Sequence, residues 1–305
     1  MAAPPPTPPT RRPVPRPAPG PAGRPGRRRA ARGLGSTFVR AWIAAAVAAV
    51  LVVGGAIVAI TVLSPGSRSA LPACQVADGS LTYTLSLDQA ANATTIAAVG
   101  KRIGLPDHAV TVAFAAALQE SQLHNLPYGD RDSLGLFQQR PSQGWGTPAQ
   151  VLTPSYAAAA FFQHLAQVGN WANLPVTVAA QQVQRSGAPS AYAVWEGEAR
   201  ALAKAMTGEV AAGLACQHPV TTPSTTAGSL QGAVTTELGS PALGASLPPP
   251  RGWTVASWLV GHASKYGITV VAYAGQTWTP DGGHWQPGGT ATDQVQFRQA
   301  TTPTT

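Results

Sequence analysis

Glu120 is the residue whose type and surroundings point most directly to chemistry. It lies near the end of a predicted apolar helix, and Val110, Ala113 and Ala117 fall on its face of that helix. Apolar neighbours disfavour the charged form of a carboxyl group and can hold it protonated near neutral pH. Such an acid can donate its proton to a glycosidic oxygen. The structural alternative is a helix-ending glutamate that pairs with a nearby arginine.

Short motifs surround this glutamate. Ser121 follows it directly, the segment 133–138 reads Ser-Leu-Gly-Leu-Phe-Gln after a loop, and Tyr192 follows an alanine. The arrangement resembles the lysozyme-like superfamily, specifically lytic transglycosylases and goose-type lysozymes, which have a helix-ending Glu-Ser, a Ser-x-Gly-Leu-(Met/Phe)-Gln segment and a later Ala-Tyr pair. The resemblance covers roughly residues 90–210, under half of the chain.

The segment 143–147, Gln-Gly-Trp-Gly-Thr, is similar to a membrane-anchored subgroup of that superfamily from GC-rich Gram-positive bacteria. The resemblance implies an enzyme that cleaves the β-1,4 bond between N-acetylmuramic acid and N-acetylglucosamine in peptidoglycan glycan strands, without a cofactor. Glu120 would be the general acid and then the base. The residues expected to bind or orient the substrate are Ser121, Tyr128, Ser133, Gly135, Phe137, Gln138, Trp145 and Tyr192.

Several of these residues have expected roles. Gly135 would let the backbone approach the saccharide, because it has no side chain. Gln138 could bind an N-acetyl group, and Tyr192 would orient Glu120 or the substrate. Tyr128, Phe137 and Trp145 are candidate sugar-stacking surfaces, although an aromatic residue taken alone is more often part of a core.

The second carboxylate of a hydrolytic mechanism has two candidates, Asp132 and Asp130. Hydrolysis requires such a group to activate water or to form an intermediate. The resemblance to lytic transglycosylases implies a route without one, because there a hydroxyl of the substrate itself attacks. The structural interpretation of Asp132 is a loop cap that accepts hydrogen bonds from backbone amides near Ser133. The choice between hydrolysis and transglycosylation therefore stays open.

The two cysteines, Cys74 and Cys216, bracket the predicted helical region almost end to end. In a compartment that permits disulfides, we expect them to be bonded to each other. The alternative is two buried free thiols. We predict no metal site, because the cysteines and scattered histidines lack the spacing of zinc ligands.

Helical periodicity dominates the region between the cysteines. Leu105-Pro106-Asp107 is typical of a helix start, and three further apolar helices are expected to begin at Pro154, Pro175 and Pro189. Beyond a linker ending in three prolines, residues 253–266 read as an amphipathic helix. Short strands are expected at 270–273, 277–278 and 294–297, with a hairpin turn at 281–283.

The chain begins with a segment rich in Pro, Ala, Gly and Arg that is expected to be disordered, and nine arginines precede the uncharged run that follows it. Residues 41–63 have no charge, and about 23 residues span roughly 34 Å as a helix, enough to cross a bilayer. We therefore expect a single-pass plasma-membrane protein that contacts lipid through this segment. The arginines place the N-terminus in the cytoplasm and the rest outside. A cleaved signal peptide is the alternative.

The predicted fold class is a mainly α lysozyme-like ectodomain after a single transmembrane helix, plus a small C-terminal α+β module. The predicted segments are a disordered cytoplasmic tail (1–37), a transmembrane helix (38–64), the lysozyme-like domain (72–217), a linker rich in Pro, Thr and Ser (218–250), the α+β module (251–298) and a disordered tail (299–305).

The overall charge excludes one class of function and leaves others open. After Arg68 the chain has ten basic and twelve acidic residues, so the bulk of the protein is slightly acidic despite the total of +8. This argues against nucleic acid as a partner, which needs basic residues spread over the folded domain. Besides the enzyme, the sequence permits an inactive peptidoglycan-binding scaffold, or a signalling membrane protein whose arginine-rich tail binds a cytoplasmic partner or anionic lipid.

Overall fold

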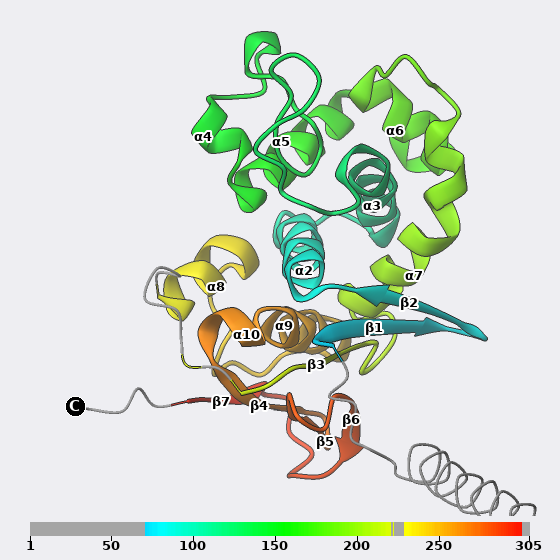
Figure 1. The fold of residues 1–305 in the computed structure, drawn as a ribbon. Helices are drawn as coiled ribbons and strands as arrows, with labels where there is room; N and C mark the ends of the chain where they lie inside the picture. Colours follow the sequence, from blue (N-terminus) through cyan, green and yellow to red (C-terminus); the bar gives the residue numbers. More distant parts are fainter. Residues whose placement is uncertain (1–70, 221, 223–228, 301–305) are drawn as a thin grey trace, which may run out of the picture. The chain divides into compact units, whose positions relative to one another are not determined.

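The computed structural model describes residues 71–220, 222 and 229–300, which form helices and two small antiparallel sheets (Figure 1). The helices are α2 (Leu87–Arg102), α3 (Asp107–Ser121), α4 (Pro148–Val151), α5 (Pro154–Gln167), α6 (Val176–Gln184), α7 (Glu196–Met206), α8 (Leu230–Leu238), α9 (Pro249–Gly261) and α10 (Ala263–Tyr266). The strands are β1 (Ala73–Asp78), β2 (Leu81–Leu85), β3 (Leu214–Gln217), β4 (Ile268–Tyr273), β5 (Gln276–Trp278), β6 (Trp285–Pro287) and β7 (Gln296–Gln299). Short 3-10 helices cover Pro141–Gln143, Trp171–Asn173 and Ala191–Trp195.

Helix α3 is the centre of the helical part of the structure. It packs against α2, α5, α6 and α7, which surround it in Figure 1. Every residue from Ala109 to Leu118 is buried, and most of them are alanine or valine. Small side chains let neighbouring helices approach closely on all sides, so this helix is buried around its whole circumference rather than along one stripe.

The ends of α3 follow from local sequence. Pro106 occupies the N-cap position, and Asp107 in the first turn faces the positive end of the helix dipole. At the other end Gln122 and Leu123 both adopt positive φ values, 54° and 61°. This left-handed pair stops the helix directly after Glu120 and Ser121 and turns the chain into the following loop.

The first sheet has the order β2-β1-β3 and joins the two ends of the region between the cysteines. Cys74 on β1 lies opposite Cys216 on β3 in the antiparallel register, with a Cα–Cα distance of 3.9 Å. The two residues form a disulfide, and both are fully buried. The predicted disulfide is therefore confirmed.

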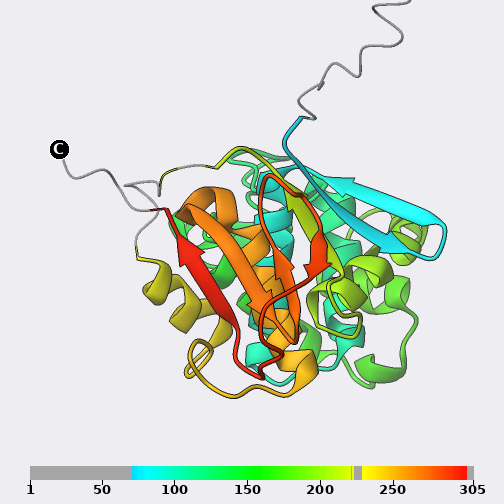
Figure 2. The same cartoon turned by 90° about the horizontal axis from the view of Figure 1, so that it is seen from below.

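The second sheet, β6-β5-β4-β7, packs against α9, as the view in Figure 2 shows. Two of its tryptophans bond to β3: Trp278 Nε1 donates to the Cys216 carbonyl at 3.0 Å, and Trp285 Nε1 donates to the Leu214 carbonyl at 2.8 Å. Trp253 and Trp258 on α9 are also buried. The tryptophans of this region thus belong mainly to the core, where an indole N–H needs a partner.

The predicted fold class, a mainly α lysozyme-like ectodomain after a single transmembrane helix plus a small C-terminal α+β module, is wrong. The described residues combine helices with two small antiparallel sheets, and strands β1, β2 and β3 lie inside the region predicted to be helical. The physical reason is the alternation of β1, where Cys74 and Val76 are buried and Gln75 between them is exposed. A period of two specifies a strand, and a tight turn at Gly79 then joins β1 to β2.

Among the residues that the structure describes, no helix is both long and apolar enough to cross a membrane. The predicted transmembrane helix at 38–64 and the predicted tail at 1–37 lie outside the described residues. Of the predicted disordered tail at 299–305, Gln299 is the last residue of strand β7, and residues 301–305 lie outside the described residues. The boundaries 72–217, 218–250 and 251–298 stay predictions. Within the predicted linker, however, Ser229 caps helix α8, whose apolar residues Leu230, Val234 and Leu238 are buried.

His262 is a buried residue from which we expect the stability of this fold to depend on pH. It is buried, stacks on Trp258 with ring centroids 4.1 Å apart, and lies within 3.4 Å of the hydroxyls of Thr94 and Thr95 on α2. Burial lowers the pKa of His262 below its ordinary value of 6.5, although the charge of Glu237 partly opposes this. The unfolded chain therefore binds a proton at a pH where the folded chain does not.

We expect the melting temperature to fall as the pH drops below about 6.5, the ordinary pKa of histidine. The His262→Gln variant should show a shallower decrease between pH 7.5 and pH 5 in a calorimetric series. Burial also lowers the pKa of His218, so this residue too should lower the melting temperature as the pH falls. Because His218 is present in both proteins, it does not affect the comparison. Parallel decreases in the two proteins would show that His262 does not contribute.

Candidate active site around Glu120

Glu120 lies in the last turn of α3, where the buried helix emerges, and its side chain is partly exposed. The preceding residues Ala115, Ala116, Ala117 and Leu118 are buried, so the carboxyl group stands at the edge of the core. Among the ion pairs of the described residues, none involves Glu120. The alternative of a glutamate paired with an arginine therefore has no support in this part of the chain.

Tyr192 is the partner of this carboxylate. Its hydroxyl donates to Glu120 Oε1 at 2.7 Å, and its ring is fully buried in the 3-10 helix Ala191–Trp195. Burial, with a smaller effect of the adjacent Glu120, raises the pKa of Tyr192 above its ordinary value. The phenol therefore stays a neutral donor and fixes one carboxylate oxygen. In the described part of the chain no group donates a hydrogen bond to the other oxygen, Oε2.

We expect Tyr192→Phe to reduce activity without unfolding the protein. The substitution keeps the buried ring but removes the hydrogen bond that orients Glu120. A loss of about tenfold in kcat is in the range for a group that positions a general acid. Steady-state kinetics on soluble peptidoglycan fragments would measure it. Unchanged kcat at an unchanged melting temperature would contradict an orienting role.

Ser121 connects α3 to the loop that follows it. Its buried hydroxyl donates to the Leu136 carbonyl at 2.7 Å and to the Ala117 carbonyl at 3.2 Å. Residues Leu134 and Gln139 pair with each other across this loop through two backbone hydrogen bonds of 3.0 Å. Ser121 therefore holds the loop against the end of the helix, and its hydroxyl is engaged in the fold.

Gly135 is a glycine because of its backbone conformation and its surroundings. Its φ is +76°, and a Cβ atom there would lie 2.6 Å from the Val151 carbonyl oxygen. The missing side chain thus allows the loop to pack against the end of α4, a different reason from the predicted approach of a saccharide. Its backbone N–H donates to the Leu126 carbonyl at 2.7 Å.

The other predicted binding residues lie in contrasting environments. Phe137 is fully buried and stacks on Phe161 with centroids 4.7 Å apart, so it belongs to the core. Gln138 has a φ of 46°, and its amide donates to the carbonyls of Tyr128 and Gly135 at 3.3 Å. Ser133 is buried, whereas the Tyr128 side chain is 68% exposed.

Trp145 is partly buried and stacks on His164, with ring centroids 3.9 Å apart. These two rings line a cavity of about 430 Å³ that also borders the end of α6. A second cavity of about 450 Å³ lies near the start of α3 and includes Asp107 and His108. Glu120 lines neither of these two cavities.

Asp132 is bound to groups of its own loop. Its Oδ1 accepts from Arg140 Nε at 2.8 Å and its Oδ2 accepts from the Ser142 backbone N–H at 2.7 Å. Hydrogen bonds from Ser142 and then Arg140 hold the pKa of Asp132 well below its ordinary value. Asp130 is exposed and lies 3.9 Å from Arg131. The geometry of Asp132 is that of a loop cap, with Ser142 in place of the expected amides near Ser133.

Two residues at the site were not predicted from the sequence. Trp195, one turn after Tyr192, donates from its indole nitrogen to Gln119 Oε1 at 2.8 Å, next to Glu120. Gln184 at the end of α6 donates to the Phe137 carbonyl at 2.8 Å. The spacing of Trp195 from Tyr192 was a usable signal, since residues three apart in a 3-10 helix share a face. The contact of Gln184 depends on tertiary structure alone.

The described residues contain no group of three or more His, Cys, Asp or Glu side chains placed to hold a metal ion. The expectation that no cofactor is needed stays a prediction. The carboxyl group of Glu120, oriented by Tyr192, is therefore the chemical feature from which a function can be proposed. No known protein-family model matches the chain, and a search of functionally characterised proteins gives no match either.

Proposed function

We propose that the protein is a glycosidase that cleaves the β-1,4 bond between N-acetylmuramic acid and N-acetylglucosamine in peptidoglycan. The observation that carries the proposal is the 2.7 Å hydrogen bond from the Tyr192 hydroxyl to Glu120 Oε1 at the edge of the core. The resemblance of the Glu120-Ser121 and 133–138 motifs to the lysozyme-like superfamily supplies the substrate class.

In this proposal Glu120 acts first as an acid and then as a base. Its protonated Oε2 donates the proton to the glycosidic oxygen as the bond from that oxygen to the muramyl ring breaks. The carboxylate then takes a proton from the attacking nucleophile, which restores the acid. Tyr192 remains a neutral donor to Oε1 throughout, so the carboxyl group keeps one orientation in both steps.

The nucleophile is proposed to be the substrate's own primary hydroxyl. Hydrolysis would require a second carboxylate to activate water or to form an intermediate. Asp132 is engaged by Arg140 and Ser142, and Asp130 is exposed to solvent beside Arg131. These contacts favour intramolecular attack, which forms an anhydro sugar and needs only Glu120.

The disulfide between Cys74 and Cys216 supports a site of action outside the cytoplasm, since such bonds persist in oxidising compartments. Peptidoglycan is also found there, so the proposed substrate and the proposed location agree.

A second candidate is a catalytically inactive protein that binds glycan and serves as a scaffold. The observation that favours it is that neither of the two cavities described above includes Glu120. Incubation of the protein with purified peptidoglycan separates the two functions. A fall in turbidity supports the enzyme, whereas protein that sediments with an intact wall and leaves turbidity unchanged supports the scaffold.

A further inference from the structure

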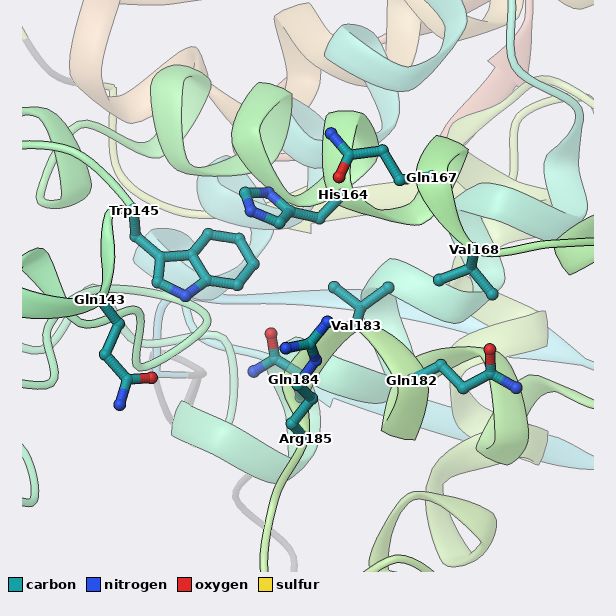
Figure 3. A pocket seen from close by; sticks show the side chains of 9 residues that line it. All are labelled: Gln143, Trp145, His164, Gln167, Val168, Gln182, Val183, Gln184 and Arg185. Carbon is teal, nitrogen blue, oxygen red and sulfur yellow. The ribbon is translucent and has the colours of Figure 1, made fainter.

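The cavity beside Trp145 has a lining that suggests a specific ligand chemistry. Figure 3 shows Trp145 and His164 on one side, with Gln184 and Arg185 opposite them. The remaining lining residues are Gln143, Gln167, Val168, Gln182 and Val183. Four glutamines offer both donors and acceptors, so the cavity suits a polar ligand that has amide groups.

The charge of this lining is positive. Arg185 ends α6 in a left-handed conformation with a φ of 51°, and none of the ion pairs formed among the described residues includes it. No aspartate or glutamate lines the cavity. A guanidinium group without an acidic partner at the edge of a cavity favours an anionic ligand, and its planar fork fits a carboxylate.

Gln184, the neighbouring residue, adds an acceptor that lacks a donor. Its Nε2 donates to the Phe137 carbonyl at 2.8 Å, which fixes the orientation of the amide. Its Oε1 is buried and has no hydrogen-bond partner among the described residues. Leaving a buried acceptor without a hydrogen bond costs free energy, so an N–H donor from a ligand would stabilise this oxygen.

The stacked rings of Trp145 and His164 supply a flat surface for an apolar part of the same ligand. His164 Nδ1 lies 2.9 Å from the Ala160 carbonyl, a contact that keeps the imidazole ring in place. A carboxylate, a nearby amide N–H and a small apolar group occur together in the last residue of a peptide. The three features of the cavity match these three groups.

We propose that this cavity binds the carboxyl-terminal residue of a peptide branch attached to the glycan substrate. Arg185 pairs with the terminal carboxylate, Gln184 Oε1 accepts from the last amide N–H, and the rings contact the apolar side chain. The choice of a glycan-linked peptide rests on the proposed function. The cavity is joined to that site, because Gln184 bonds to Phe137 and Ser121 bonds to the adjacent Leu136.

The test measures binding separately from cleavage. The full-length Glu120→Gln protein is titrated with a synthetic N-acetylmuramyl tetrapeptide ending in D-alanine, whose only carboxylate is terminal, and with the same compound ending in a carboxamide. Isothermal calorimetry gives each Kd. The NMR signal of the Trp145 indole N–H shows whether the probe binds in this cavity. We expect the carboxamide to bind about tenfold more weakly or worse, because a charge-assisted pair is lost.

Arg185→Gln in the same background should weaken binding of the carboxylate probe by a similar factor and make the two probes equivalent. Arg298→Gln, which removes an exposed arginine on β7, is the matched control and should change neither Kd. A melting curve checks that each variant is folded. If Arg185→Gln is unstable, the inference is still tested by the two probes on the Glu120→Gln protein, which retains Arg185.

Equal affinities of the two probes, or no effect of Arg185→Gln in a folded protein, would overturn the inference even if the wild type cleaves peptidoglycan. A carboxylate-dependent Kd with no cleavage by the wild type would support the inference and refute the proposed enzyme. A peptide that lacks the sugar serves as a third probe. If this peptide binds as tightly as the muramyl peptide, the cavity recognises the carboxyl-terminal residue without contacts to the sugar, which also supports the inference.

Discussion

Glu120→Gln is expected to lower the rate of peptidoglycan cleavage by about 10²–10⁴-fold, the range for loss of general acid–base catalysis. The amide has nearly the same shape as the carboxyl group, and its oxygen can still accept the hydrogen bond from Tyr192. It has no acidic proton to give to the glycosidic oxygen. The melting temperature should therefore change little, while turbidity loss and product release nearly stop.

The matched control is Glu196→Gln, which neutralises an exposed glutamate at the start of α7, close in sequence to Tyr192. This variant should retain the wild-type rate. Equal rates for wild type and Glu120→Gln would remove Glu120 from the mechanism. A large fall in the melting temperature of Glu120→Gln would instead indicate that the carboxyl group has a structural role at the end of α3.

Cys74→Ser should produce the largest loss of stability, about 2–5 kcal/mol in the free energy of unfolding under oxidising conditions. The disulfide closes a loop with a sequence separation of 142 residues, so its removal frees a long part of the unfolded chain. It also joins two strands whose cysteines are fully buried. Denaturant titration with and without reductant measures the effect.

Cys216→Ser is the natural companion variant, because it removes the same bond from the other strand. Both variants should match the reduced wild type within experimental error, and reductant should have no further effect on either of them. If reductant destabilised the variants as much as the wild type, the disulfide could not be the cause.

Part of the fold could be predicted because its signals are local. Pro106 and Asp107 mark the start of α3, Pro154 begins α5, and α6 begins directly after Pro175. Strands β4, β5 and β7 lie close to their predicted positions, whereas β6 was not predicted. Strands β5 and β6 pair across the expected turn at 281–283. These signals act through the backbone of a few neighbouring residues, so no tertiary information is needed.

The remaining parts depend on contacts between distant segments. Strand β1 is short and is specified only by pairing with β2 and β3, the latter from the other end of the disulfide loop. Helix α8 lies in a segment whose composition resembles a linker, and it is stabilised by burial of three apolar residues. Neither pairing nor burial of this kind can be read from a local pattern.

In the candidate site, too, some features could be predicted from the sequence and others depend on tertiary contacts. The structure brings Glu120 and Tyr192 together from positions 72 residues apart. Ser121, Gly135 and Phe137 were expected to bind substrate, but the contacts that they make in the structure are within the fold. Ser121 bonds to the loop that follows α3, Gly135 packs against α4, and Phe137 stacks on Phe161 in the core. A motif residue can have its type for reasons of folding, and only its tertiary contacts reveal which reason applies.

The central claim is that Glu120 transfers a proton to a glycosidic bond, and mass spectrometry of muropeptides released from purified peptidoglycan tests it most directly. The account predicts fragments with anhydro ends from the wild type and no new glycan ends from Glu120→Gln. New reducing ends would preserve the role of Glu120 but replace the sugar hydroxyl with water as the nucleophile. No new glycan ends from folded wild-type protein, or the same ends from Glu120→Gln, would contradict the claim.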